Sequence, residues 1–136
     1  MRTMDNWIEI YENLSIEEFK KENCYDTTPI SEYLNDLLKC HNLQPKDVIL
    51  KFNMDRSYAY QLLKGRRNPP RNFLLRIALL CHLNLEETQT LLTIGRRPLL
   101  YPSNPFDAAV LYGIVHQLNE EQVNLLLHDI GEDCFS

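Results

Sequence analysis

The chain has 136 residues, a formal net charge of −5 and 44% hydrophobic residues, which suits one small domain with a modest core. It contains no apolar run long enough to span a membrane and no signal-peptide pattern, so we expect a cytoplasmic protein. Glycine is scarce and no useful length of sequence alternates as a strand does. The sequence therefore predicts an all-α fold.

Residues 1–27 predict an acidic helical arm. An apolar helix face is expected over four residues at helical spacing: Trp7, Ile8, Tyr11 and Leu14. Ser15 and Glu18 form a candidate capping box for a second short helix, in which we expect Ile16 and Phe19 to face inward. Such an arm could cap its own core, dock on a second subunit or engage a regulator, and the first of these is favoured.

A second segment, residues 28–97, begins with a helix after Thr28-Pro29. Its expected buried face is Ile30, Tyr33, Leu34, Leu37 and Leu38. Another helix is predicted to begin at Pro45, because proline at the first helical position lacks only an N–H that would be unpaired there. Val48, Ile49 and Phe52 form its apolar face.

A short turn and a further helix follow. Asn53 is expected to end the preceding helix in the left-handed conformation, Met54 to plug the space between the helices, and Asp55 to cap the next one. That helix should run from Arg56 to about Lys64, with Gly65 closing it. Its inner face is predicted to consist of Ala59, Leu62 and Leu63.

The outer face of the 56–64 helix carries side chains that suit base edges and phosphates. These residues are Arg56, Ser57, Tyr58, Tyr60, Gln61 and Lys64. Arginine pairs well with guanine, glutamine with adenine, and serine with either a base or a phosphate. A solvated face of an ordinary helical domain is the alternative, but the turn spacing and the basic loop that follows favour contact with DNA.

Charge is divided unevenly along the chain. Residues 1–27 have three basic and seven acidic groups (net −4), residues 28–98 have eleven and six (net +5), and residues 99–136 have none and six (net −6). Five cations lie within sixteen residues: Arg56, Lys64, Arg66, Arg67 and Arg71. Such a cluster suits phosphates. The acidic flanks should face away from DNA, and they serve either solubility or a protein partner.

The segment from about Pro29 to Leu92 resembles the lambda repressor-like (XRE) family of bacterial and phage helix-turn-helix proteins. The matching residues are Val48, Ile49, Met54, Asp55, Ala59, Leu62, the loop Gly65-Arg66-Arg67-Asn68-Pro69, the apolar helix Phe73–Leu83 and Asn84-Leu85-Glu86-Glu87. The chain departs from the family at Pro45, where glutamine is usual and where Gln44 stands one residue earlier, and at Asn53, which replaces the usual turn glycine.

The resemblance implies a lambda repressor-like helix-turn-helix bundle whose recognition helix is Arg56–Lys64. It implies that double-stranded DNA is the partner. The expected base contacts are Arg56, Ser57, Tyr58 and Gln61. The expected phosphate contacts are Gln44, Tyr60, Lys64, Arg66, Arg67 and Asn68. The two tyrosines are bulkier than is usual and could stack, read a thymine methyl or face a protein.

Residues 98–136 predict a proline-rich connector and a C-terminal helical hairpin. Three prolines among residues 98–105 indicate an extended connector. Helices are then expected at Phe106–Leu118 and Glu120–His128, with Asn119 as a cap and Gly131 at the end. A bacterial subgroup of the family has a similar connector and helical pair. We hypothesise that this hairpin supports a homodimer, because repressor-like proteins span two half-sites of DNA.

Catalytic and metal sites are not indicated. There is no glycine-rich phosphate loop and no nucleophile triad that can be placed from the sequence, so neither an enzyme nor a cofactor is expected. Cys40-His41 and Cys81-His82 are adjacent pairs, whose side chains diverge on a helix and would grip one metal poorly. We expect both cysteines in the core and both histidines on the surface.

Two functions follow from these patterns. The favoured one is a sequence-specific DNA-binding transcriptional regulator, a dimeric repressor that inserts the helix Arg56–Lys64 into the major groove. The alternative is a protein-interaction module, antitoxin-like or an adaptor, that keeps the fold without sequence readout. Pro45, the two tyrosines (Tyr58 and Tyr60) and the acidic flanks favour the alternative slightly.

Overall fold

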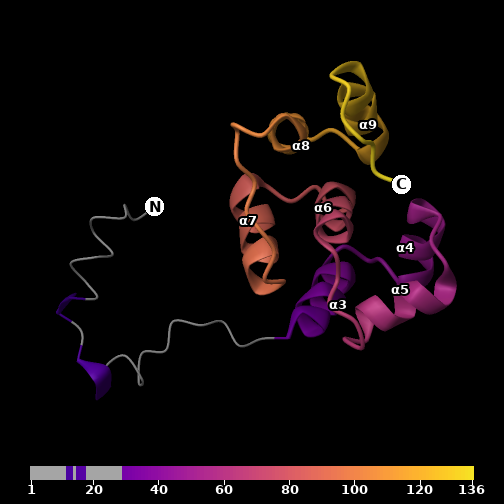
Figure 1. Ribbon diagram of the computed structural model, residues 1–136. Coiled ribbons are helices and arrows are strands. Elements are labelled where there is room, and N and C mark those ends of the chain that lie inside the picture. The colour runs from indigo at the N-terminus through magenta and orange to yellow at the C-terminus, as the bar shows by residue number, and fades with distance from the viewer. Residues whose placement is uncertain (1–11, 14, 18–28) are drawn as a thin grey trace.

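The computed structural model describes residues 12–13, 15–17 and 29–136. Within this part of the chain the helices are α3 (Ile30–Cys40), α4 (Pro45–Phe52), α5 (Arg56–Leu63), α6 (Arg71–Leu80), α7 (Leu85–Ile94), α8 (Pro105–Val115) and α9 (Glu120–Asp129) (Figure 1). No strand occurs among the described residues, which confirms the all-α prediction. Each helix in the same residues is too short or too polar to bridge a lipid bilayer.

Most of the predicted N-terminal arm lies outside the described residues. This applies to Trp7, Ile8, Tyr11, Leu14, Glu18 and Phe19. Ile16 is described, and 76% of its surface is exposed. The prediction that Ile16 faces inward is therefore wrong, because no apolar surface covers it in the described part of the structure.

Helix α6 forms the centre of the core. All seven residues from Phe73 to Leu79 are buried, and α6 contacts α7, α8 and α9. A surface helix normally buries one apolar stripe, whereas a helix covered on several sides needs apolar residues all round. The Phe73 ring meets the Phe52 ring edge to face, with the ring centroids 5.8 Å apart, and so joins α4 to this core.

Three of the joints between helices are built in the same way. Each begins with a residue of positive φ: Asn42 (56°), His82 (51°) and Gln117 (55°). The next residue is a leucine whose N–H donates to the carbonyl five residues earlier, at 2.8 to 3.0 Å. The residue after the leucine caps the next helix. Asn119, for example, accepts from the Gln122 N–H at 2.9 Å, which confirms its predicted capping role.

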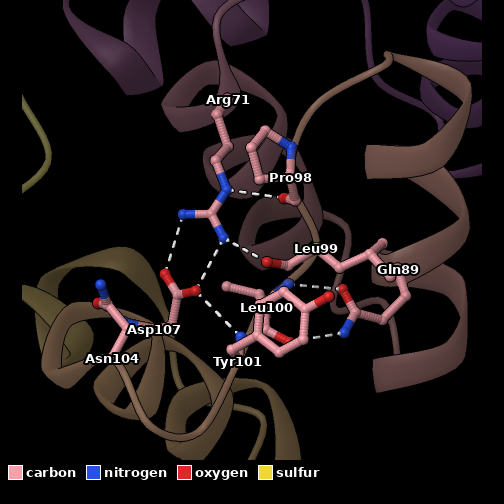
Figure 2. Close-up of polar contacts among 8 residues, drawn as sticks. All are labelled: Arg71, Gln89, Pro98, Leu99, Leu100, Tyr101, Asn104 and Asp107. Carbon is pink, nitrogen blue, oxygen red and sulfur yellow. Dashed lines mark hydrogen bonds and ion pairs between the residues drawn. The ribbon is translucent and has the colours of Figure 1, made fainter.

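An ion pair joins the start of α6 to the C-terminal hairpin. Both oxygens of the Asp107 carboxylate, on α8, accept from the Arg71 guanidinium at 2.9 Å (Figure 2). The Tyr101 N–H donates to the same carboxylate at 3.0 Å. Asp107 is buried, so both of its oxygens are paired inside the protein.

The connector between α7 and α8 is held by side chains from two helices. Arg71 also donates to the carbonyl oxygens of Pro98 and Leu99, at 2.8 and 2.9 Å. On the other side of the connector, the Gln89 amide donates to the Leu100 carbonyl and accepts from the Leu100 N–H (Figure 2). These contacts satisfy the backbone of an extended segment that no neighbouring strand pairs with.

A second arginine joins α4, α6 and α9. The Arg76 side chain is buried and pairs with both carboxylate oxygens of Glu120. It also donates to the Phe52 carbonyl at 3.1 Å and to the main-chain oxygen of Ser136 at 2.8 Å, and its guanidinium carbon lies 4.3 Å from the centroid of the Phe52 ring. Arg76 thus fixes the end of α4 relative to the hairpin.

Candidate nucleic-acid interface

The turn between α4 and α5 consists of Asn53, Met54 and Asp55. Asn53 has φ 50° and ψ 49°, which confirms the predicted left-handed end of α4. Met54 is half-buried and packs against the core, as expected of an apolar plug. The Asp55 carboxylate accepts from the Tyr58 N–H at 2.9 Å and so caps α5. The three residues 53–55 therefore set where α5 begins.

Helix α5 divides into a buried face and an outer face. Ala59, Leu62 and Leu63 are buried, which confirms the predicted inner face. Residues of the outer face line an open surface hollow of about 530 Å³: Asp55, Arg56, Ser57, Tyr60, Gln61, Lys64 and Arg66. Three of the four predicted base-contacting residues thus lie together. The fourth, Tyr58, is half-buried and packs against the core.

The basic loop after α5 folds back on the end of that helix. Gly65 has φ +80°, as expected of a helix-closing glycine. The N–H groups of Arg66 and Arg67 both donate to the Gln61 carbonyl, at 3.0 and 3.3 Å. The side chains of Arg66, Arg67 and Asn68 are exposed. This fold-back brings the loop cations beside the outer face of α5.

Two neighbouring elements hold the basic loop in place. The Asn35 amide, on α3, donates to the Leu63 carbonyl at 2.8 Å. Arg97, just after α7, donates to the carbonyl oxygens of Pro69 and Asn68 at 2.9 and 3.3 Å. The loop is therefore anchored at both ends by polar contacts from outside α5.

Two tyrosine rings on α5 lie under the exposed cations. The Arg56 guanidinium carbon and the Lys64 ammonium nitrogen lie 5.6 and 5.4 Å from the centroid of the Tyr60 ring. The Arg67 guanidinium carbon lies 5.8 Å from the centroid of the Tyr58 ring. Aromatic faces attract cations at such distances. The tyrosines thus restrict where three of these positive groups can lie.

Four cations of this surface have no ion-pair partner among the described residues: Arg56, Lys64, Arg66 and Arg67. From the sequence we counted Arg71 among these cations, but that assignment is wrong. Arg71 is paired with Asp107, and its side chain is only 22% exposed. The basic cluster therefore consists of four cations on α5 and its loop, because the acidic tail neutralises the fifth.

A second hollow, of about 470 Å³, lies beside the first and has an apolar floor. Its lining residues are Gln44, Pro45, Lys46, Ile49, Leu50, Arg56 and Tyr60. Gln44, a predicted phosphate contact, is exposed at the start of α4, and its N–H donates to the Asp47 carboxylate at 2.7 Å. Leu50 is 78% exposed. Sequence reasoning missed Leu50, although three consecutive apolar residues at 48–50 cannot all face inward on a helix.

The cysteines differ from one another in burial. Cys81 is buried, as predicted, and burial raises the pKa of its thiol to about 11. Cys40 is exposed at the end of α3, so its predicted place in the core is wrong. The exposed positions of His41 and His82 were predicted correctly. No cluster of metal-ligating side chains occurs among the described residues.

Comparison of the chain with models of known protein families gave no match. The same was true of comparisons with curated proteins and with solved structures.

Proposed function

We propose that this protein is a sequence-specific DNA-binding transcriptional regulator of the lambda repressor-like (XRE) type. In this proposal α4 and α5 are its helix-turn-helix, and α5 is the recognition helix. The observation that carries the proposal is the cluster formed by Arg56, Lys64, Arg66 and Arg67, none of which has a carboxylate partner within residues 29–136. Unpaired cations around exposed hydrogen-bonding side chains suit the phosphates and base edges of a duplex.

The mechanism begins with α5 entering the major groove. Arg56 would bind guanine through two hydrogen bonds, Gln61 would bind adenine, and Ser57 would reach a base or a phosphate. Tyr58 would contact a thymine methyl from its half-buried position. The expected phosphate contacts are Gln44, Tyr60, Lys64, Arg66, Arg67 and Asn68. Repression then follows from occlusion of the promoter.

A homodimer is part of the proposal, because two recognition helices must reach half-sites about 34 Å apart. Its support comes from the outer face of α8, where Tyr112 is 53% and Val115 is 65% exposed. No charged residue lies on this face, since Asp107, the one charged residue of α8, is buried. Sedimentation at micromolar concentration tests the dimer, and a monomer throughout would contradict it.

The alternative is a protein-interaction module, antitoxin-like or an adaptor. The exposed Leu50 side chain favours it, because an apolar group beside cations suits an amphipathic acidic protein better than it suits a phosphate backbone. The DNA-binding proposal remains the better supported of the two, because the four unpaired cations outnumber this single apolar group.

The dependence of DNA affinity on salt tests the proposal. The slope of log affinity against log salt reports the number of neutralised phosphates, about 0.9 for each. The three cations assigned to phosphates, Lys64, Arg66 and Arg67, predict a loss of about 40-fold for one subunit when salt rises from about 50 to about 200 mM. Weak binding that does not change with salt would instead favour the protein-interaction module.

A further inference from the structure

The surface formed by α4 and α5 combines positive charge with exposed apolar area. We call it the α4–α5 surface and define it by the residues Pro45, Lys46, Ile49, Leu50, Arg56, Tyr60, Lys64 and Arg66, which line the two adjoining hollows. Leu50 is 78% exposed, and Pro45 and Ile49 are half-buried beside it. Phosphates account for the cations but leave the leucine uncovered. An occupant that is both acidic and apolar fits the whole surface.

The N-terminal part of the chain enters the described structure at the edge of this surface. Pro29, which directly precedes α3, lines a hollow together with Pro45, Tyr60, Lys64 and Arg66. Residues 1–28 are therefore tethered beside the cations of α5. Glu32 is the only carboxylate among the residues that line this hollow, so the two cations Lys64 and Arg66 outnumber the acidic groups there.

The sequence of the tethered segment matches the α4–α5 surface in chemistry. Residues 1–27 carry a net charge of −4. Glu9 and Glu12 alternate with the apolar residues Trp7, Ile8, Tyr11 and Leu14. The apolar face of α8 is a poorer site for this segment, because residues 99–136 carry a net charge of −6 and would repel it. Ile16 is 76% exposed in the structure, and docking would cover it.

The length of the tether permits docking within one chain. The fifteen residue steps from Leu14 to Pro29 span at most about 50 Å, which exceeds the extent of two helices of eight residues each. Two sites joined by a short stretch of the same chain meet at an effective concentration in the millimolar range. Even weak docking would then occupy the surface for much of the time.

We propose that residues 5–17 dock on the α4–α5 surface of their own chain and compete with DNA for it. This inference rests on the proposed function for its consequence, which is autoinhibition of DNA binding. The docking itself does not depend on DNA, and it can be measured separately.

The first test compares DNA affinity among full-length variants. Glu9→Gln/Glu12→Gln removes two charges from the arm. Asp129→Asn/Asp133→Asn removes two from exposed positions of the tail and serves as the matched control. Release of a segment that competes at millimolar effective concentration predicts that the arm variant binds DNA about tenfold more tightly than the parent protein. The DNA affinity of the control should stay within about twofold of that of the parent protein. Equal affinities for all three proteins would overturn autoinhibition.

The second test uses Trp7, the one tryptophan of the chain, and needs no DNA. Docking predicts that Trp7 resists acrylamide quenching in the full-length protein and that Leu50→Ser raises its quenching constant at least about twofold. Leu125→Ser, at a residue of α9 that is 66% exposed, is the matched control and should leave the constant unchanged. Equal quenching in all three proteins would overturn docking.

The two tests together separate the inference from the function on which it rests. Protection of Trp7 that Leu50→Ser abolishes, in a protein that binds no DNA, would leave docking in place and remove the proposed function. DNA binding without any protection of Trp7 would leave the proposed function in place and overturn docking. Protection that grows with protein concentration would mean that the arm docks on a second copy, and this would overturn docking within one chain.

Discussion

Arg71 and Asp107 are 36 positions apart in the sequence, yet they form a bidentate ion pair with both contacts at 2.9 Å. The pair neutralises one arginine of the basic segment and joins α8 to the start of α6. Arg71 also holds the connector through the carbonyl oxygens of Pro98 and Leu99 (Figure 2). Part of the acidic charge of the tail is thus structural. Four other cations of this segment lie on α5 and its loop, and none of them pairs with the tail.

Loss of the Asp107 charge should destabilise the fold. Asp107→Asn leaves the Arg71 guanidinium partly buried without its counter-charge, and we expect a loss of about 3 kcal/mol in the free energy of unfolding. Urea denaturation measures it. Asp129→Asn, at an exposed position of α9, is the control and should change stability by less than about 0.5 kcal/mol. Equal effects at the two positions would show that the pair contributes nothing.

The same carboxylate should make stability depend on pH in the acid range. Burial alone would raise the pKa of Asp107, but the hydrogen bonds from Arg71 and from the Tyr101 N–H, together with the Arg71 charge, lower it below its ordinary value of 3.8. Folding therefore favours the ionised form. The resulting stability is present above the ordinary pKa and is lost as pH falls through the lowered one. The gap in stability between the parent protein and Asp107→Asn should narrow from pH 5 to pH 2, and a constant gap would contradict this origin.

Gly65 and Gly131 provide a matched pair of substitutions. Both have positive φ, +80° and +77°, so alanine should cost about 1 kcal/mol at each position. A Cβ on Gly65 would also lie 2.8 Å from the Ser31 Oγ, whereas a Cβ on Gly131 would meet nothing within 4 Å. We expect thermal denaturation to show a loss larger by about 1 to 2 kcal/mol for Gly65→Ala. Ser31→Gly should recover most of this excess loss of stability. Equal losses at the two glycines would mean that α3 shifts to accommodate the new Cβ with no change in the free energy of unfolding.

The Tyr60 ring should matter to DNA binding beyond its hydroxyl group. It lies beneath both Arg56 and Lys64, and an exposed cation–π contact is worth about 0.5 to 1 kcal/mol. Tyr60→Phe keeps the ring and removes the hydroxyl group, so we expect affinity to fall by no more than about threefold. Tyr60→Leu loses both contacts and should weaken binding about tenfold. Equal affinities for the two variants, measured by fluorescence anisotropy on one duplex, would show that the ring does not position the cations.

Base contacts and phosphate contacts should respond differently to substitution. Arg56→Ala and Gln61→Ala are each expected to cost about 1 to 3 kcal/mol on a selected site and to relax the preference for one base pair. Arg67→Ala should weaken all sequences alike and reduce the salt slope by about one. Binding to a panel of single-base variants of the site measures both effects. Uniform weakening by Arg56→Ala would mean that this residue binds phosphate.

The sequence was sufficient for the helix boundaries around the candidate site, because local chemistry sets them. Pro45 at the first helical position, Asn53 in the left-handed conformation, Asp55 as a cap and Gly65 as a closing residue each act on their immediate neighbours. Such signals can be read from a few adjacent residues. The same reasoning predicted the Asn119 cap of α9.

Contacts between distant elements could not be predicted in this way. The pairs Arg71–Asp107 and Arg76–Glu120 depend on how the hairpin packs on α6, and no local pattern encodes that packing. Cys40 was misplaced for a related reason: whether a neighbouring element covers the last residue of α3 depends on packing between helices, and the structure leaves Cys40 exposed. Tyr58 was assigned to the outer face from its angular position on the helix. That position does not show how far a large ring reaches toward the core, and in the structure Tyr58 packs against it.

Selection of bound duplexes from a random-sequence library by the purified full-length protein tests whether α5 is a recognition helix. We expect an enriched motif arranged as an inverted repeat, with half-sites about one helical turn apart. We also expect Arg56→Ala to abolish or alter the enrichment. No enrichment by protein shown to be folded would contradict the assignment of α5 as a recognition helix.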